Sequence, residues 1–116
     1  MSKQEELADL HEKWAAKNTC ALKTIATQPV PGDGSAFSKI VFIGEAPGKK
    51  EDELGRPFVG AAGKFLAEML GSINLKREDI YITNSVKYRP PDNRDPEPDE
   101  KEACAPWLYA ELNLIA

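Results

Sequence analysis

The chain has 116 residues, of which 41% are hydrophobic, and its formal net charge is −4. This length allows one domain with a modest core. The acidic balance argues against a protein that coats nucleic acid non-specifically, because such proteins neutralise many phosphates at once. No apolar run approaches the roughly 20 residues that span a bilayer, and the N-terminus has no signal-peptide pattern. We therefore expect a cytoplasmic protein.

The N-terminal segment predicts an amphipathic helix over residues 2–18. Its apolar side chains recur at helical spacing, namely Leu7, Leu10 and Trp14. We expect His11 to be a solvated residue at the margin of this helix, because a lone histidine without metal-ligating neighbours is seldom a ligand.

The middle of the chain predicts a βαβ unit. Residues 39–44 indicate a short buried strand and residues 79–84 a second one. Residues 61–71 between them predict a helix that ends at a glycine, with an apolar face made of Phe65, Leu66, Met69 and Leu70. The two strands should be parallel and joined by a right-handed crossover. A polar loop over 86–98 should lead into a last helix over 99–115, in which we expect Pro106 to start a new turn or to kink the helix.

Two strands are too few for a sheet that is covered on both faces, which usually has about four or more. We expect residues 1–116 to be the N-terminal portion of one α/β domain, or to borrow strands from a partner.

Parallel α/β sheets bind ligands at the carboxyl ends of their strands. The segment GEAPGKKEDELGRPFVGAAGK over residues 44–64 follows the first strand, and the second strand ends at Asn84. Gly44 and Gly48 would let backbone N–H groups approach a ligand closely, and residues 60–63 open a helix, where an anion such as a DNA phosphate is favoured. The glycines alone fit a turn without a chemical role equally well.

A nucleoside-triphosphate loop is the obvious rival, because GAAGK resembles the end of a Walker A motif. Phe58 stands where the first glycine of that motif belongs, and Phe65 replaces the Ser or Thr that holds magnesium. We set this interpretation aside. On composition alone, Phe58 could equally be a core aromatic.

Four segments resemble the family 4 (type a) uracil-DNA glycosylases, in this order and spacing: GEAPGKKED, GRPFVGAAGK, ITNSVKYRPPDNRDPEPDE and ACAPWL. The resemblance runs from about Trp14 to the end of the chain. It implies a three-layer α/β/α fold with a parallel sheet that these 116 residues leave incomplete. It also implies hydrolysis of the N-glycosidic bond of uracil in DNA, which leaves an abasic site for base excision repair. The implied partner is uracil-containing DNA, and no contact with a membrane is implied. We expect the complete form to be a monomer.

The resemblance also implies site residues. Phe58 would stack on the uracil, and Asn84 would pair its amide with the uracil edge, which needs one donor and one acceptor. Glu45 and Ala46 occupy the place where related enzymes position the attacking water, with Ala46 replacing a carboxylate that some of them use. More of the catalysis would then fall to electrostatic stabilisation. The supporting pocket residues would be Gly44, Gly48, Glu51 and Asn93.

Two departures from the family accompany this resemblance. The family holds a 4Fe-4S cluster with four cysteines, whereas this chain has Lys17, Cys20, Tyr88 and Cys104 at those positions. Two thiolates cannot complete such a site, so we expect two buried thiols, packing by Tyr88 and no cofactor. A late loop with a uracil-contacting histidine is also absent from these residues. A non-catalytic DNA-binding or polymerase-associated accessory module is therefore the main alternative, and a small nucleotide-phosphate-binding domain is a weaker one.

Overall fold

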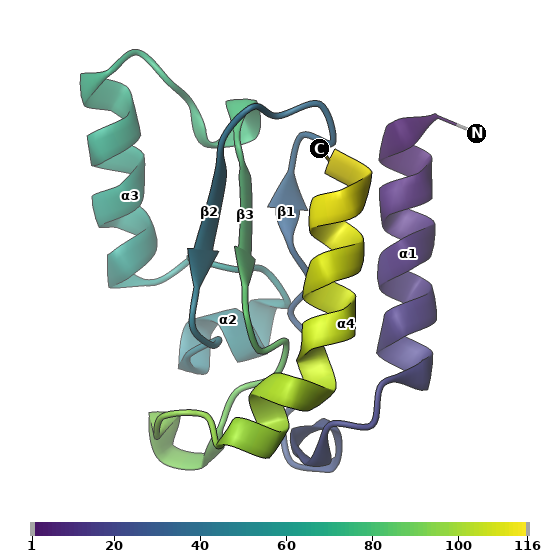
Figure 1. Cartoon of the computed structure of the whole chain (residues 1–116). Helices are drawn as coiled ribbons and strands as arrows, with labels where there is room; N and C mark the ends of the chain where they lie inside the picture. Colours follow the sequence, from purple (N-terminus) through teal and green to yellow (C-terminus); the bar gives the residue numbers. More distant parts are fainter. Residues whose placement is uncertain (1, 116) are drawn as a thin grey trace.

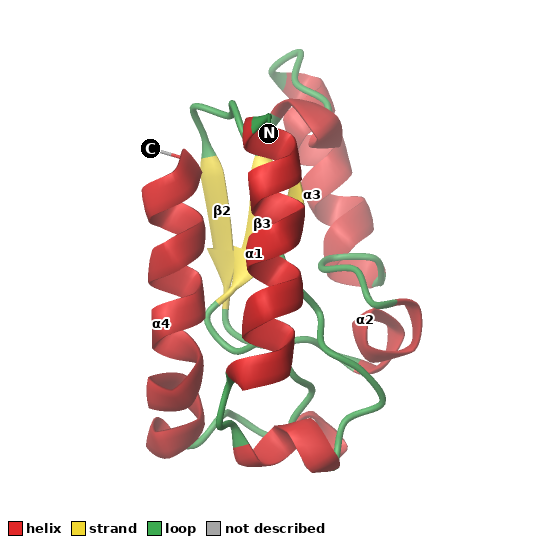
Figure 2. Cartoon of the chain, turned by 90° about the vertical axis from the view of Figure 1, so that its right-hand side faces the viewer, coloured by secondary structure: helices red, strands yellow, loops and turns green. Residues whose placement is uncertain are grey.

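Helices lie on both faces of a small sheet in the computed structural model, which describes residues 2–115 (Figure 1). Helices α1 (Lys3–Lys17) and α4 (Pro98–Ile115) pack side by side on one face. Helices α2 (Lys49–Leu54) and α3 (Ala61–Ser72) lie on the other side, as the turned view in Figure 2 also shows. The three-layer α/β/α arrangement expected from the sequence is confirmed.

The sheet has three strands among residues 2–115, in the order β1-β3-β2. Strands β2 (Val41–Gly44) and β3 (Tyr81–Asn84) are parallel, as expected, with Gly44 opposite Asn84. Strand β1 (Asp33–Gly34) is an addition to the expected sheet and pairs with β3 in the antiparallel sense. Because β2 and β3 run in register, their carboxyl ends meet at one end of the molecule.

Short 3-10 helices connect these elements, namely η1 (Ala21–Thr24), η2 (Arg77–Asp79) and η3 (Pro91–Asn93). The last helix begins at Pro98 and contains Pro106, and Figure 1 shows its first turns set at an angle to the rest. A proline inside a helix lacks the N–H for the usual hydrogen bond, which accounts for a bend there. Among residues 2–115, no helix is long and apolar enough to cross a bilayer.

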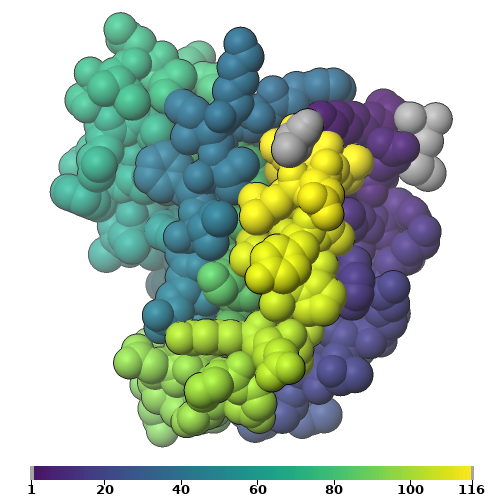
Figure 3. Space-filling view, viewed as in Figure 1, coloured from purple at the N-terminus to yellow at the C-terminus, as the bar shows by residue number. Residues whose placement is uncertain are grey.

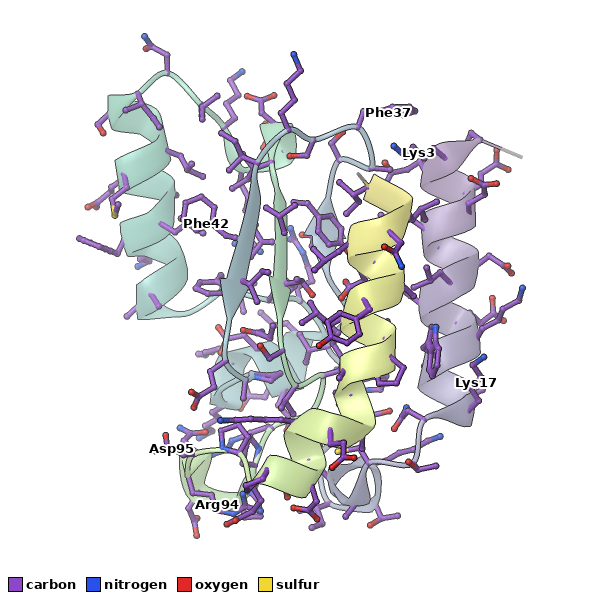
Figure 4. The ribbon with its side chains drawn as sticks, in the orientation of Figure 1. Lys3, Lys17, Phe37, Phe42, Arg94 and Asp95 are labelled. Atoms are coloured by element: carbon purple, nitrogen blue, oxygen red, sulfur yellow. The ribbon has the colours of Figure 1, made fainter. Side chains whose placement is uncertain are left out.

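Strand β2 is only partly buried, so the expectation of a buried strand was wrong at this position. Phe42 points toward α3 and packs against the buried cluster of Leu66, Leu70, Ile80 and Ile82 (Figure 4), but Ile43 on the other face is 48% exposed. The reason is that β2 is the edge strand: within the described residues, only β3 pairs with it. Figure 3 shows this segment at the surface between α3 and α4.

The expected apolar face of α3 is correct for one row of side chains and wrong for the other. Leu66 and Leu70 are buried against β2 and β3. Phe65 is 64% exposed and Met69 is 49% exposed. The two rows lie about 100° apart around a helix, and only the first row is turned toward the sheet.

His11 contradicts its expected place at a solvated helix margin, because its ring lies between α4 and β3 and the side chain is 14% exposed. The Trp107 Nε1–H donates to His11 Nδ1 at 3.0 Å, and His11 Nε2 lies 2.9 Å from the Tyr81 hydroxyl. An indole nitrogen can only donate, so Nδ1 is unprotonated and Nε2–H donates to Tyr81. Burial accordingly lowers the pKa of His11.

Candidate functional site

A pocket of about 140 Å³ opens at the carboxyl ends of β2 and β3. Its lining residues are Glu45, Ala46, Glu51, Phe58, Ala62 and Asn84. Apart from Ala62, each of these was a site residue expected from the sequence. The crossover from β2 through α3 to β3 therefore brings these segments, distant in sequence, to one place, as the strand-end rule for parallel sheets predicts.

Gly44 forms the contact point between the two residues expected to recognise a base. A Cβ atom added at Gly44 would lie 2.4 Å from Asn84 Oδ1 and 2.7 Å from Phe58 Cζ. The strand register places Gly44 directly opposite Asn84, so the amide side chain crosses the glycine without obstruction. The absence of a side chain at residue 44 is what lets the Asn84 amide and the Phe58 ring reach the same pocket.

Glu51 accepts hydrogen bonds from both ends of the glycine-rich loop. Its Oε1 atom accepts from the Gly48 N–H at 3.0 Å, and its Oε2 atom accepts from the N–H groups of Val59 and Gly60, both at 2.9 Å. Burial opposes ionisation of Glu51, but these N–H donors outweigh it and hold the pKa of the carboxyl below its ordinary value. The anion at the start of α3, where we expected a DNA phosphate, is therefore a carboxylate of the chain itself.

Phe58 has an unusual backbone conformation, with φ of 52°. This left-handed region is unfavourable for a bulky side chain. Gly63 makes room for it, because a Cβ atom there would lie 1.8 Å from the Phe58 carbonyl oxygen. The glycine at the start of α3 thus allows the Phe58 backbone to approach the helix closely.

Asn93 lies outside the pocket that holds Phe58 and Asn84. It lines a neighbouring groove of about 220 Å³, which shares Glu45 and Ala46 with the pocket. Its Oδ1 atom accepts from Arg89 Nε at 2.7 Å. The groove runs beside the loop that carries Arg94 and Asp95, at the end of the molecule where the strands terminate (Figure 4).

Comparison with known proteins assigns the family. The profile of the Uracil DNA glycosylase superfamily matches residues 31–116. The chain belongs to this superfamily. Relatives include two proteins named Type-4 uracil-DNA glycosylase. The one from Archaeoglobus fulgidus is 52% identical over 96% of this chain and 56% of its own length. The one from Sulfurisphaera tokodaii is 47% identical over 96% of this chain and 51% of its own length.

A DNA polymerase of Bacillus phage SP01 is also similar, being 35% identical over 81% of this chain and 10% of its own length. The chain spans about half the length of the Type-4 relatives it matches.

Lys87 supports the pocket of this superfamily member from behind, although it is fully buried. Its Nζ atom donates to the Thr83 hydroxyl at 2.6 Å and to the Asn84 carbonyl oxygen at 2.5 Å, and it forms an ion pair with Glu111 at 2.5 Å. Burial lowers the pKa of Lys87, while the Glu111 carboxylate opposes this. These bonds fix the backbone from which the Asn84 amide projects. The only sequence signal was a lysine three residues after the end of a strand, which a solvated loop would also show.

The four positions at which the uracil-DNA glycosylase resemblance implies a cluster do not fit one. Cys20 and Cys104 are free and buried in one apolar cluster, and hydrogen bonding with Cys104 lowers the pKa of Cys20 to about 7. The Tyr88 hydroxyl instead accepts from Asn18 Nδ2 at 2.8 Å. Lys17 lies on the outer side of α1, with its Nζ atom 4.1 Å from the Trp14 ring centroid (Figure 4). Two thiols are left, and two cannot complete a four-thiolate site.

Proposed function

We propose that this chain forms the base-recognising part of a DNA repair enzyme that hydrolyses the N-glycosidic bond of uracil in DNA. One observation carries this proposal: the Asn84 amide and the Phe58 ring meet across Gly44 in a pocket at the strand ends. The names of the Type-4 relatives support the same substrate.

The pocket offers the two contacts that a flipped base requires. The face of a pyrimidine stacks on an aromatic ring, which Phe58 provides. The uracil edge presents acceptors and one N–H donor, and the Asn84 amide has both a donor and an acceptor to match them. Asn84 is 3% exposed, so a base that fails to pair with the amide would leave buried polar groups without partners.

In this proposal, the catalysis of hydrolysis falls mainly to stabilisation of the developing charge. As the bond between C1′ and N1 breaks, its electron pair leaves with the base and the sugar gains oxocarbenium character. Water adds to C1′ and loses a proton, and the uracil anion takes up a proton, so the products are free uracil and an abasic sugar. We assign to the Asn84 N–H the stabilisation of the negative charge that develops on uracil. Ala46 has no carboxylate to activate the water, and Glu45 beside it lies at the solvent-exposed rim.

We also propose that the chain functions without a 4Fe-4S cluster, with Tyr88, Cys20 and Cys104 packing the space between η1 and α4. The cytoplasmic location and the monomeric state of the complete form stay predictions. The two free thiols are compatible with a reducing compartment.

To test uracil release, residues 1–116 are joined to the C-terminal remainder of the Archaeoglobus fulgidus relative, and the joined protein is assayed. Release is measured on an oligonucleotide with one deoxyuridine, with a thymidine oligonucleotide beside it. We expect Asn84→Ala to slow release about 100- to 1000-fold, because it removes a donor aimed at developing charge. Phe58→Ala should weaken uracil binding about 5- to 100-fold, because it removes a stacking face.

Two substitutions far from the pocket serve as matched controls. Asn113→Ala alters an exposed amide on α4, and Phe37→Ala alters a ring that is 69% exposed at the opposite end of the molecule (Figure 4). Both should leave release unchanged. An active parent whose rate is insensitive to Asn84→Ala and Phe58→Ala would show that the pocket lies elsewhere. A folded, inactive parent that still binds DNA would favour a non-catalytic accessory module, the alternative that the similarity to a phage DNA polymerase supports.

A further inference from the structure

We propose that Arg77 is a positioning residue that holds Phe58 in its left-handed backbone conformation and thereby aims the ring into the pocket. The inference deepens the proposed function and rests on it for the identity of the base. It concerns a side chain from η2 that lies outside the glycine-rich loop and does not line the pocket.

The Phe58 conformation needs an external support. A phenylalanine with φ of 52° is in a region that bulky side chains rarely adopt, because Cβ crowds the neighbouring carbonyl. Such a conformation persists only when the surroundings fix it. Gly63 leaves room for the Phe58 carbonyl oxygen, but room alone does not favour one conformation over another.

Arg77 supplies the fixing contacts. Its Nη1 atom donates to the Phe58 carbonyl oxygen and its Nη2 atom donates to the Pro57 carbonyl oxygen. The guanidinium is a planar fork with donors in fixed directions. Two consecutive carbonyl groups bound to one fork cannot rotate independently, so the peptide between Pro57 and Phe58 keeps its orientation.

The position of the Arg77 guanidinium is itself energetically unfavourable. Its side chain is 21% exposed and lies 3.7 Å from the Asp33 carboxylate on β1. Its Nε atom is buried and has no hydrogen-bond partner among residues 2–115, and burial lowers the pKa of Arg77. A buried donor without a partner is unfavourable. The arginine therefore makes its contacts with the loop even though part of its guanidinium group loses its hydration.

Arg56 offers a matched control. It donates to the same Asp33 carboxylate through Nε at 3.2 Å and Nη2 at 2.8 Å, and its side chain is 59% exposed. Among the described hydrogen bonds, none joins it to the carbonyl groups of Pro57 or Phe58. Arg56→Met therefore removes an arginine from the same aspartate without touching the contacts that fix Phe58.

The first measurement is made on the 116-residue chain by NMR and does not depend on activity. A residue with positive φ gives a strong cross-relaxation signal between its own amide and Hα protons. We expect this signal for Phe58 in the parent chain and in Arg56→Met, and its loss in Arg77→Met. Arg77→Lys should lose it too, because an ammonium group lacks the fork. Thermal unfolding of each variant identifies any that fails to fold.

The second measurement uses the chain joined to the C-terminal remainder of its Archaeoglobus relative. We expect Arg77→Met to raise KM and the inhibition constant of free uracil about 3- to 10-fold, less than loss of the whole stacking face, with little change in kcat. In a Phe58→Ala background, adding Arg77→Met should have no further effect on uracil inhibition. A merely structural role would lower stability equally in both backgrounds and would not produce this difference.

Retention of the Phe58 signal in a folded Arg77→Met chain would overturn the proposal. So would equal weakening of uracil inhibition in both backgrounds. If Arg77→Met changes the Phe58 conformation while the unmodified joined protein releases no uracil, then the hold of Arg77 on Phe58 stands and the proposed function is what fails.

Discussion

The pocket depends on a residue that has no side chain. A methyl group at position 44 would overlap both the Asn84 amide and the Phe58 ring. We expect Gly44→Ala to weaken inhibition by free uracil at least about 10-fold, and the overpacking to cost about 1–3 kcal/mol of unfolding free energy. Inhibition of uracil release and urea unfolding measure the two effects.

Gly71→Ala is the matched control for this substitution. Gly71 lies in α3, and apart from the neighbouring backbone of its own helix, no atom of the described residues would lie within 4 Å of a Cβ atom there. Alanine favours a helix over glycine, so this variant should gain about 0.5–1 kcal/mol of stability and bind uracil as the parent does. Unchanged uracil inhibition in Gly44→Ala would count against the placement of the base beside this strand end.

At the level of single residues, strand-end positions could be predicted and long-range supports could not. Glu45, Ala46 and Asn84 lie at the ends of two parallel strands, so their position at this edge of the sheet could be predicted, whereas their roles were implied by the family resemblance. The left-handed conformation of Phe58 has no local signal, because it depends on Arg77 beyond the crossover helix. The buried role of Lys87 likewise depends on Glu111, 24 residues later in the chain.

His11 is an uncharged residue in the contact of α1 with α4 and β3. Because the pKa of His11 is lowered in the fold, the unfolded chain binds a proton more readily below the ordinary histidine pKa of about 6.5. This contribution to stability is present above that pH and is lost as the pH falls toward the lower folded-state value. We expect the unfolding free energy to fall by on the order of 1 kcal/mol between pH 6.5 and pH 5.

His11→Gln should reduce this loss, as urea unfolding at several pH values would show. It is the only histidine in the sequence, so no other side chain has its ordinary pKa in that interval. A parent and variant with the same dependence on pH from 6.5 to 5 would contradict an uncharged His11.

At the level of elements, length decided what could be predicted. The pattern of apolar residues indicates α1, α3 and α4 because each is long enough to show a period. Strand β1 has two residues and α2 has six, which is too short for any period. The error in the exposed row of α3, Phe65 and Met69, arises because the apolar pattern is wider than the contact with the sheet.

On the scale of the whole molecule, the positions expected to bind a cluster would have joined α1 and η1 to the loop after β3 and to α4. We expect the chain purified without oxygen to contain no stoichiometric iron, since only two of the four ligands are thiols. Iron analysis and visible absorbance measure this. The double variant Lys17→Cys with Tyr88→Cys restores four cysteines and serves as the positive control. Stoichiometric iron and a brown colour in the unmodified chain would contradict the expectation.

The parallel pair of strands and the helix on one face could be predicted because strand, helix and strand follow in order. The full three-layer architecture was implied by the family resemblance. The side chains that remain at the surface could not be predicted in the same way. Ile43 is apolar in a strand pattern and half exposed, because burial of an edge strand depends on neighbours that the local pattern does not specify.

Glu51 has a consequence for the entropy of binding. Its carboxylate receives the N–H groups of Gly48, Val59 and Gly60 at once, so the loop between β2 and α3 is closed into a ring by one side chain before any base arrives. If the loop were free and became ordered only on binding, its loss of conformational entropy would weaken the affinity. Here that loss belongs to folding, so under the proposed function the contacts with a base are not offset by the ordering of this loop.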